Sequence, residues 1–410
     1  MSPFRTVLNG FGWGSSLRFT GALLAALKIA ILARILTPTD FGIFSLILVG
    51  LGLSEAATET GINTTLLQTK RKLSEFTNTA WSIAILRGVL IGLLMLAVGA
   101  LLQEWYGEPG LFRLMIWAAV VPIIKSFIHP GLIHYKKELD FKHDTLYRGS
   151  VLLVEVFATV GLVLVWPTVT SLIGGLLVSS VYEVGLSYGL LRGIPRWQIV
   201  RQRAEEIFAN AASLLPSSLL SYLAENSDNV VFGKLTSTAT LGLYQNAYLL
   251  SHKPNSELGK LLGSSSLAVY TSLINSRKSE SHPSTWNLYR QTIVKGVGLF
   301  TVLSLPLFLF PELLVKIILG SQWLSIVPAL PALGVAGILQ TISHLTHPIL
   351  IAEKKYRGVL IEQLISLSVM LTGMVILVPS HGILGAAVSL CIARFVGAGI
   401  LYVFVRKEYA

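Results

Sequence analysis

The chain has 410 residues, of which 53% are hydrophobic and only 13% are charged, and its mean hydropathy is +0.67. An average soluble domain carries roughly a quarter charged residues, so this composition excludes a water-soluble fold. The formal net charge of +11 raises the question of a nucleic-acid partner, which the distribution of the basic residues must answer.

Long apolar stretches follow one another along the chain, and each is long enough to cross a bilayer as a helix. The first has no short apolar region ending in a cleavage site, so we expect it to be retained as a helix. We predict an all-α membrane protein with about twelve spans, at 12–35, 42–66, 79–102, 111–133, 149–166, 170–191, 207–233, 241–268, 291–311, 325–350, 358–378 and 383–405.

Basic residues gather in every second connection, as at Lys70–Lys72 and Lys136–Arg148, whereas the intervening connections contain only Lys316. This positive-inside pattern places both termini in the cytoplasm and fits an even number of spans. The excess positive charge is therefore explained by topology, and it predicts no nucleic-acid partner.

The two halves of the chain contain a similar segment, Arg34–Phe44 in the first and Lys234–Tyr244 in the second. An offset near half the chain predicts a 6+6 repeat, with lobes at 1–191 and 207–410 joined by a cytoplasmic linker at 192–206. In such transporters the cargo cavity lies between the repeats, which rock to give alternating access. The alternative is a helix–turn signal that both halves share.

Ionisable residues inside spans are costly and usually face a cavity or a partner. Arg18 and Lys28 lie on one broad face of the first span. Glu55 and Glu59 lie four residues apart in the second span, so one side of that helix is polar. We expect these acids to pair with Lys28 or Arg18; the alternative is that they take up protons or another cation.

The eighth span carries Lys253, Glu257 and Lys260 on a single stripe. The stripe either presents two cations to an anionic cargo or is a salt-bridge row that satisfies itself. Asn226 and Asp228, near the end of the seventh span, are expected to line the same cavity.

The remaining charged residues of the spans have simpler interpretations. Long basic side chains near span ends can reach the headgroups, and we assign this role to Arg34, Arg87, Arg113, Lys234, Lys295 and Arg394. Single acids most often join neighbouring helices, and we assign this role to Glu155, Glu183 and Glu362.

The sequence lacks the signatures of several enzyme classes. It has no phosphate-binding G-x-x-x-x-G-K-[ST] loop, no Cys/His cluster with metal-ligand spacing and no nucleophile elbow, and its one cysteine, Cys391, lies in the last span. The outward connections are too short for a polymerase or ligase, and a scaffold or receptor would need no half-chain repeat. We therefore expect a non-enzyme without metal or cofactor.

The segment Leu32–Ser45, followed by Leu53-Ser-Glu, resembles the opening of bacterial polysaccharide flippases of the multidrug/oligosaccharidyl-lipid/polysaccharide (MOP) exporter superfamily. Leu219–Leu223 and Gly320-Ser-Gln-Trp resemble later parts of the same family. The resemblance implies two six-helix lobes around a central cavity. It also implies translocation of undecaprenyl-pyrophosphate-linked oligosaccharide units from the cytoplasmic to the outer leaflet of the bacterial inner membrane, for O-antigen, capsule or exopolysaccharide assembly.

In this family, cavity arginines and lysines bind the pyrophosphate, and Arg18, Lys28, Lys253 and Lys260 match that role here. The implied partners are the lipid-linked cargo, membrane lipids and a polysaccharide polymerase. Many relatives have fourteen spans where we predict twelve. The alternative function is an ion-coupled drug exporter of the same superfamily, but cationic drugs favour an acidic cavity, whereas the intramembrane residues here lean basic.

Overall fold

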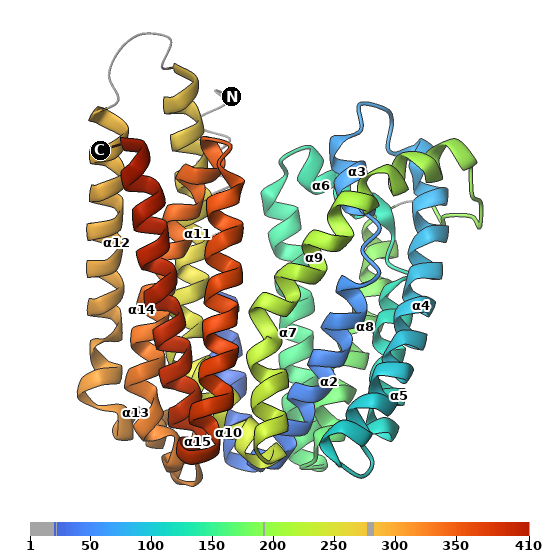
Figure 1. The fold of residues 1–410 in the computed structure, drawn as a ribbon. Helices are drawn as coiled ribbons and strands as arrows, with labels where there is room; N and C mark the ends of the chain where they lie inside the picture. The colour runs from blue at the N-terminus through green and yellow to red at the C-terminus, as the bar shows by residue number, and fades with distance from the viewer. Residues whose placement is uncertain (1–19, 22, 192, 277–282, 410) are drawn as a thin grey trace. The chain divides into compact units, whose positions relative to one another are not determined.

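The computed structural model describes four stretches of the chain: 20–21, 23–191, 193–276 and 283–409. The chain divides into two compact units, Met1–Asn226 and Ser227–Ala410, which we call the N-terminal and C-terminal units. All regular elements within the described stretches are helices (Figure 1). Seven of these helices are long and apolar enough to cross a membrane, and two bent helix pairs raise the number to nine. The all-α membrane fold is confirmed, while the count of twelve spans stays a prediction.

The N-terminal unit starts with a helical segment at 23–35. Its further elements are α2 (Pro38–Ala56), α3 (Ile62–Gln68), α4 (Ser74–Tyr106), α5 (Leu111–Lys125), the 3-10 helix η1 (Pro130–Leu132), α6 (Ile133–Lys137), α7 (Phe141–Val165), α8 (Val169–Leu190) and most of α9 (Arg201–Leu235). The C-terminal unit contains α10 (Thr238–Ser251), α11 (Lys253–Ser276), α12 (Pro283–Leu309), α13 (Pro311–Ile318), the 3-10 helix η2 (Ser321–Ala329), α14 (Leu330–Ala352) and α15 (Tyr356–Tyr409).

The segment that recurs in both halves is a helix start in both units. Thr37 caps α2 in a reciprocal arrangement with Asp40, whose backbone N–H donates to Thr37 Oγ1 at 3.3 Å while its carboxylate accepts from the Thr37 backbone at 3.0 Å. Ser237 caps α10 with one of these two contacts, accepting from the backbone N–H of Thr240 at 3.2 Å. The similarity therefore encodes N-terminal capping at corresponding positions of the two halves.

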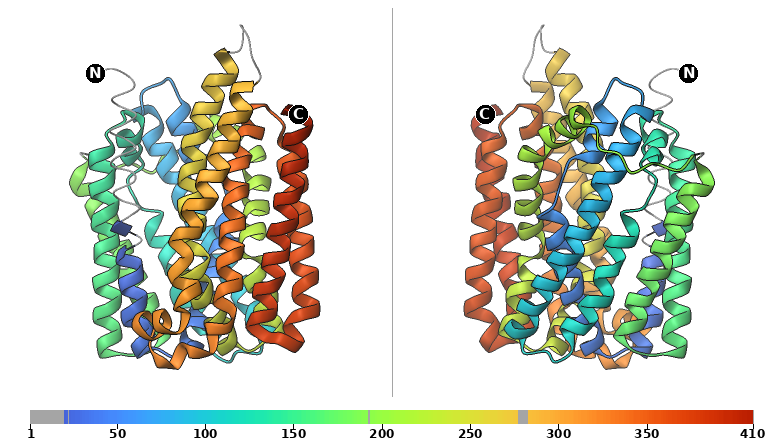
Figure 2. Two further views of the ribbon diagram at one scale, coloured as in Figure 1. Left: turned by 90° about the vertical axis from the view of Figure 1, so that its left-hand side faces the viewer. Right: turned by 90° about the vertical axis from the view of Figure 1, so that its right-hand side faces the viewer.

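Several predicted spans differ from the helices. The predicted span 42–66 is interrupted between α2 and α3, where Gly61 has a positive φ of 73°. The spans 358–378 and 383–405 are the two arms of α15, which reverses at Gly382 (φ 53°, ψ −128°) and whose arms lie side by side (Figure 2). The predicted linker 192–206 overlaps α9, which continues through the boundary between the compact units.

The spans show the surface that a membrane requires. On α7, the apolar side chains Phe157, Leu164 and Val165 are 71%, 67% and 65% exposed. Water would penalise such a surface, whereas lipid tails solvate it, so α7 presents this face to the bilayer.

Small residues allow close helix packing in the N-terminal unit. A Cβ atom added to Gly88 of α4 would lie 2.3 Å from Cβ of Ser126, directly after α5, so only glycine permits this approach. Near the N-terminal end of α4, Phe76 belongs to a buried cluster that joins α3, α4, α6 and α9. These contacts fix the walls of a cavity inside the unit.

Candidate functional site

The predicted cation pair of the first span is only partly covered by the structure. Arg18 lies outside the described residues. Lys28 Nζ lies 2.7 Å from Glu155 Oε1 of α7, so its partner is Glu155 and neither Glu55 nor Glu59. The expected pairing of Lys28 with the acids of the second span is therefore wrong, because α7 supplies a carboxylate at hydrogen-bond distance.

The stripe on α11 forms an internal salt-bridge row. Glu257 Oε1 lies 3.3 Å from Lys253 Nζ and 3.8 Å from Lys260 Nζ, and all three side chains are about half or one-third exposed. This geometry matches the self-satisfying alternative, and a role of the two lysines toward a cargo stays a prediction.

The two polar residues near the end of α9 have local partners. Asn226 donates to the backbone carbonyl of Tyr222 at 3.0 Å. Asp228 is only 4% exposed and accepts a hydrogen bond from the hydroxyl of Tyr244 at 2.9 Å. The first contact lies within α9 and the second joins α9 to α10, and binding by either residue stays a prediction.

The N-terminal unit encloses a cavity of about 380 Å³, which has walls from every element between α2 and α8. Its polar lining includes four basic and three acidic side chains, which are Arg87, Lys125, Lys136, Arg148, Glu55, Asp144 and Glu183. Of the predicted site residues, Glu55 lines this cavity, while Lys28, Glu59 and the residues of the C-terminal unit do not.

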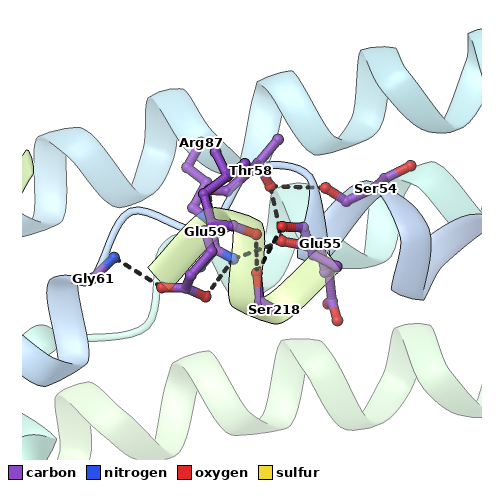
Figure 3. Close-up of polar contacts among 9 residues, drawn as sticks. Ser54, Glu55, Thr58, Glu59, Gly61, Arg87 and Ser218 are labelled. Carbon is purple, nitrogen blue, oxygen red and sulfur yellow. Dashed lines mark hydrogen bonds and ion pairs between the residues drawn. The ribbon is translucent and has the colours of Figure 1, made fainter. Parts of the chain in front are cut away.

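Arg87 of α4 holds the interruption between α2 and α3 (Figure 3). Its Nε donates to the Thr58 carbonyl at 2.7 Å, and one terminal nitrogen lies 3.1 Å from the Glu55 carbonyl and 3.2 Å from Glu59 Oε2. The other Glu59 oxygen accepts from the backbone N–H of Gly61 at 2.8 Å. Arg87 thus donates to the Thr58 carbonyl and adds a donor to the Glu55 carbonyl, which also accepts from the Thr58 backbone N–H. Its interpretation as a headgroup-reaching side chain is therefore incomplete.

The other cations of the cavity differ in their partners. Lys125 Nζ lies 3.4 Å from Glu183 Oε2, and Arg148 Nε lies 3.0 Å from Asp144 Oδ2. Lys136 has no hydrogen-bond or ion-pair partner within the described part of the chain. It is exposed to solvent at its position in α6.

The α7 end of the cavity is fixed by a capping residue. The Asp140 side chain accepts from the backbone N–H of His143 at the start of α7. Desolvation raises the pKa of the Asp140 carboxyl, but hydrogen bonds from His143 and the charges of His143 and His134 outweigh it, so the net pKa is lowered. The cap therefore stays ionised at neutral pH, where it favours the helix start that carries Asp144 and Arg148.

This arrangement suits binding of an anionic group. Among the described residues, no group of three or more His, Cys, Asp or Glu could hold a metal ion. The cavity offers one cation without an ion-pair partner, Lys136, on a long and flexible side chain. Beside it lie two ion pairs, in which another anion could replace the carboxylate. The signal for this site in the sequence was the basic run Lys136–Arg148, which topology alone also explains.

Comparison with known proteins gives a family and relatives over most of the chain. Residues 31–328 match the family described as polysaccharide biosynthesis protein. The chain is 21% identical to the lipopolysaccharide biosynthesis protein WzxC of Escherichia coli (strain K12), over 87% of this chain and 72% of the relative. It is 20% identical to the teichuronic acid biosynthesis protein TuaB of Bacillus subtilis (strain 168), over 85% of this chain and 72% of the relative.

Solved structures share the fold. The lipid II flippase MurJ, in an inward closed conformation, has a TM-score of 0.73 at 15% identity, over 96% of this chain and 87% of its own. An inward-facing multidrug resistance MATE family transporter of the MOP superfamily has a TM-score of 0.69 at 15% identity, over 95% and 94%. At this identity the likeness shows the fold alone. Because the family match covers more than half of the 410 residues, the chain belongs to the polysaccharide biosynthesis protein family and has the two-lobe, all-α fold of the MOP superfamily.

Proposed function

We propose that this protein is a flippase that moves a lipid-linked oligosaccharide unit from the cytoplasmic to the outer leaflet of a bacterial inner membrane by alternating access. The product serves the assembly of a surface polysaccharide such as O-antigen, capsule or exopolysaccharide. The observation that carries the proposal is the match to the polysaccharide biosynthesis family over residues 31–328. The protein makes and breaks no covalent bond in this role, and a polysaccharide polymerase is its expected partner.

The cavity of the N-terminal unit supports this proposal through its chemistry. A lipid-linked oligosaccharide carries phosphate charge that must cross a medium of low dielectric, whereas its lipid tail can stay in the bilayer. A volume of about 380 Å³ is at the small end of ligand sites, so we assign it to the phosphate end of the cargo rather than to the sugar chain.

The expected topology agrees with loading from the cytoplasm. Lys136 and Arg148 lie at the two ends of a connection that the basic-residue pattern assigns to the cytoplasmic side. The unpaired Lys136 is then the first cation that an incoming phosphate meets. Both chain termini lie on this side in the proposed topology.

Complementation tests the proposal directly. A host that lacks its own flippase for a matched sugar unit receives the intact chain, and surface polymer is measured. We expect rescue by the intact chain. A charge-assisted hydrogen bond contributes about 1.5–3 kcal/mol, so Lys136→Ala should weaken cargo binding roughly 10- to 100-fold.

Lys142→Ala removes an exposed lysine that does not line the cavity and is the matched control. If the intact, inserted chain gives no polymer, the cargo assignment is wrong; a drug exporter would instead restore resistance in a host without efflux pumps. If both lysine variants rescue equally, the flippase assignment stands but the cavity is not the phosphate site.

A further inference from the structure

A histidine–glutamate pair joins α14 to α15 in the C-terminal unit. His347 Nε2 lies 3.0 Å from Glu362 Oε2, and Glu362 is only 1% exposed. Both residues belong to helices with the length and composition of membrane spans. An ionisable group in such a place is costly and is a functional candidate by default.

The surroundings of Glu362 are built for a carboxyl group. Ser343 of α14 and Ser366 of α15 both donate to Glu362 Oε1, at 3.4 and 3.3 Å. Gly397, on the second arm of α15, leaves the necessary room, because a Cβ atom there would lie 2.6 Å from the same oxygen. Each carboxyl oxygen therefore has at least one partner, and the four hydrogen-bonding groups come from two helices.

Further ionisable groups surround the pair. Those that act on it or on its histidine neighbours are His344 of α14, Arg394 of α15, Lys253 and Lys260 of α11, and His252 between α10 and α11. His344 Nε2 lies 3.2 Å from the Ser256 hydroxyl of α11. From α12, Tyr289 bonds Thr346 of α14 through its hydroxyl.

One of these neighbours is a buried base without a hydrogen bond. His252 is 1% exposed, and neither of its ring nitrogens has a hydrogen-bond partner in the part of the chain that the structure describes. An unpaired imidazole in an apolar interior is costly, so it needs a donor or a proton at some stage of the cycle. His252 is therefore a second candidate proton acceptor in the same unit, linked to the pair through their shared neighbours His344 and Arg394.

We propose that the His347–Glu362 pair is a proton-binding site that couples transport to a proton gradient. With one proton, shared between imidazole and carboxylate, the pair is electrically neutral, which the membrane interior favours. A hydronium ion delivers this proton and leaves as water. When the α14–α15 seam admits water, the carboxylate is solvated, with Arg394 as its nearby positive charge, and the proton is released.

The coupling role rests on the proposed flippase function, whereas proton binding itself does not. It also replaces the alternative that Glu59 takes up the proton, since that carboxylate is held by Arg87 and the Gly61 backbone. Glu55 remains on the cavity wall as a separate group.

Infrared difference spectroscopy on the purified, lipid-reconstituted full chain tests proton binding without any cargo. As pH is lowered, we expect a protonation band of the pair, an imidazolium ring band accompanied by a shifted carboxylate stretch, which His347→Gln removes and Glu362→Gln shifts. Glutamine has the shape of glutamate and can still accept from the two serines, so this variant should fold. Glu312→Gln, which changes a 62% exposed side chain, should leave the band in place. A band unchanged in both Glu362→Gln and His347→Gln would overturn the proposal.

The complementation assay then tests coupling with the same variants. We expect Glu362→Gln and His347→Gln to lose surface polymer, while Glu312→Gln keeps it. If the infrared band disappears but polymer is normal, the site binds a proton that does not drive transport, and the coupling proposal is overturned. If the intact chain itself gives no polymer, the flippase assignment fails while the infrared result still decides on proton binding.

Discussion

Arg87 offers the sharpest test of how the N-terminal unit holds its cavity. Its guanidinium bonds the Thr58 and Glu55 carbonyls at 2.7 and 3.1 Å and pairs with Glu59 at 3.2 Å. Arg87→Ala leaves two carbonyls and one carboxylate without this donor. Hydrogen bonds to charged groups contribute about 1.5–3 kcal/mol, and removing one partner of a buried pair costs about 3–5 kcal/mol.

The expected loss of unfolding free energy in Arg87→Ala is smaller than the sum of these contributions, because water reaches the site. The side chains of Arg87 and Glu59 are 23% and 32% exposed, so we expect Arg87→Ala to lower the free energy of unfolding by about 2–4 kcal/mol. Arg87→Lys keeps the charge, but an ammonium group cannot donate to all three acceptors as the planar guanidinium does. This variant should therefore lower the free energy of unfolding by about half as much.

Reversible unfolding in mixed detergent micelles, followed by tryptophan fluorescence, measures these differences. Arg113→Ala is the matched control, because Arg113 is an exposed arginine in the same unit. A change in Arg87→Ala no larger than that in Arg113→Ala would refute the assignment of Arg87 to the helix interruption. The double variant with Glu59→Gln separates the ion pair from the carbonyl contacts.

Other changes follow from single contacts. Lys28→Glu should destabilise the N-terminal unit by about 1–3 kcal/mol, and adding Glu155→Lys should restore most of this in the same unfolding assay, since the two atoms are 2.7 Å apart. Gly88→Ala should cost about 1–3 kcal/mol, because its Cβ would meet Ser126 at 2.3 Å, and a normal unfolding midpoint would contradict that packing. Thr37→Ala should cost about 1 kcal/mol through loss of the α2 cap, read from the same unfolding curves.

The fold class could be predicted because its signal is local. Apolar runs of span length and the alternation of basic connections are visible without knowing any contact, and the segments beginning at Thr37 and Ser237 carry their own capping residues. The interruption after α2 was missed for the opposite reason. Arg87, a residue of another helix, donates to its carbonyls, and sequence spacing does not reveal such a donor.

The site could be predicted less well, because partners are distant in the sequence. Lys28 pairs with Glu155, 127 positions away, while the nearer acids Glu55 and Glu59 looked equally suitable from periodicity. Lys136 was hidden for a different reason. A lysine in a basic connection satisfies the topology rule whether it points to water or into a cavity. The positive-inside pattern therefore explained Lys136 fully, and its place in a cavity could not be inferred.

The balance of charge around the cavity is consistent with the proposed function, in which one site both binds and releases an anion. Four basic and three acidic side chains line it, so the cavity carries little net charge, and three of the four cations have a carboxylate partner in a low dielectric. In the proposed function, an incoming phosphate would meet Lys136 first and gain further contacts only by competing with Glu183 for Lys125 or with Asp144 for Arg148. In the proposed function, each competing carboxylate can recover its partner, which weakens phosphate binding and favours release on the other side of the membrane.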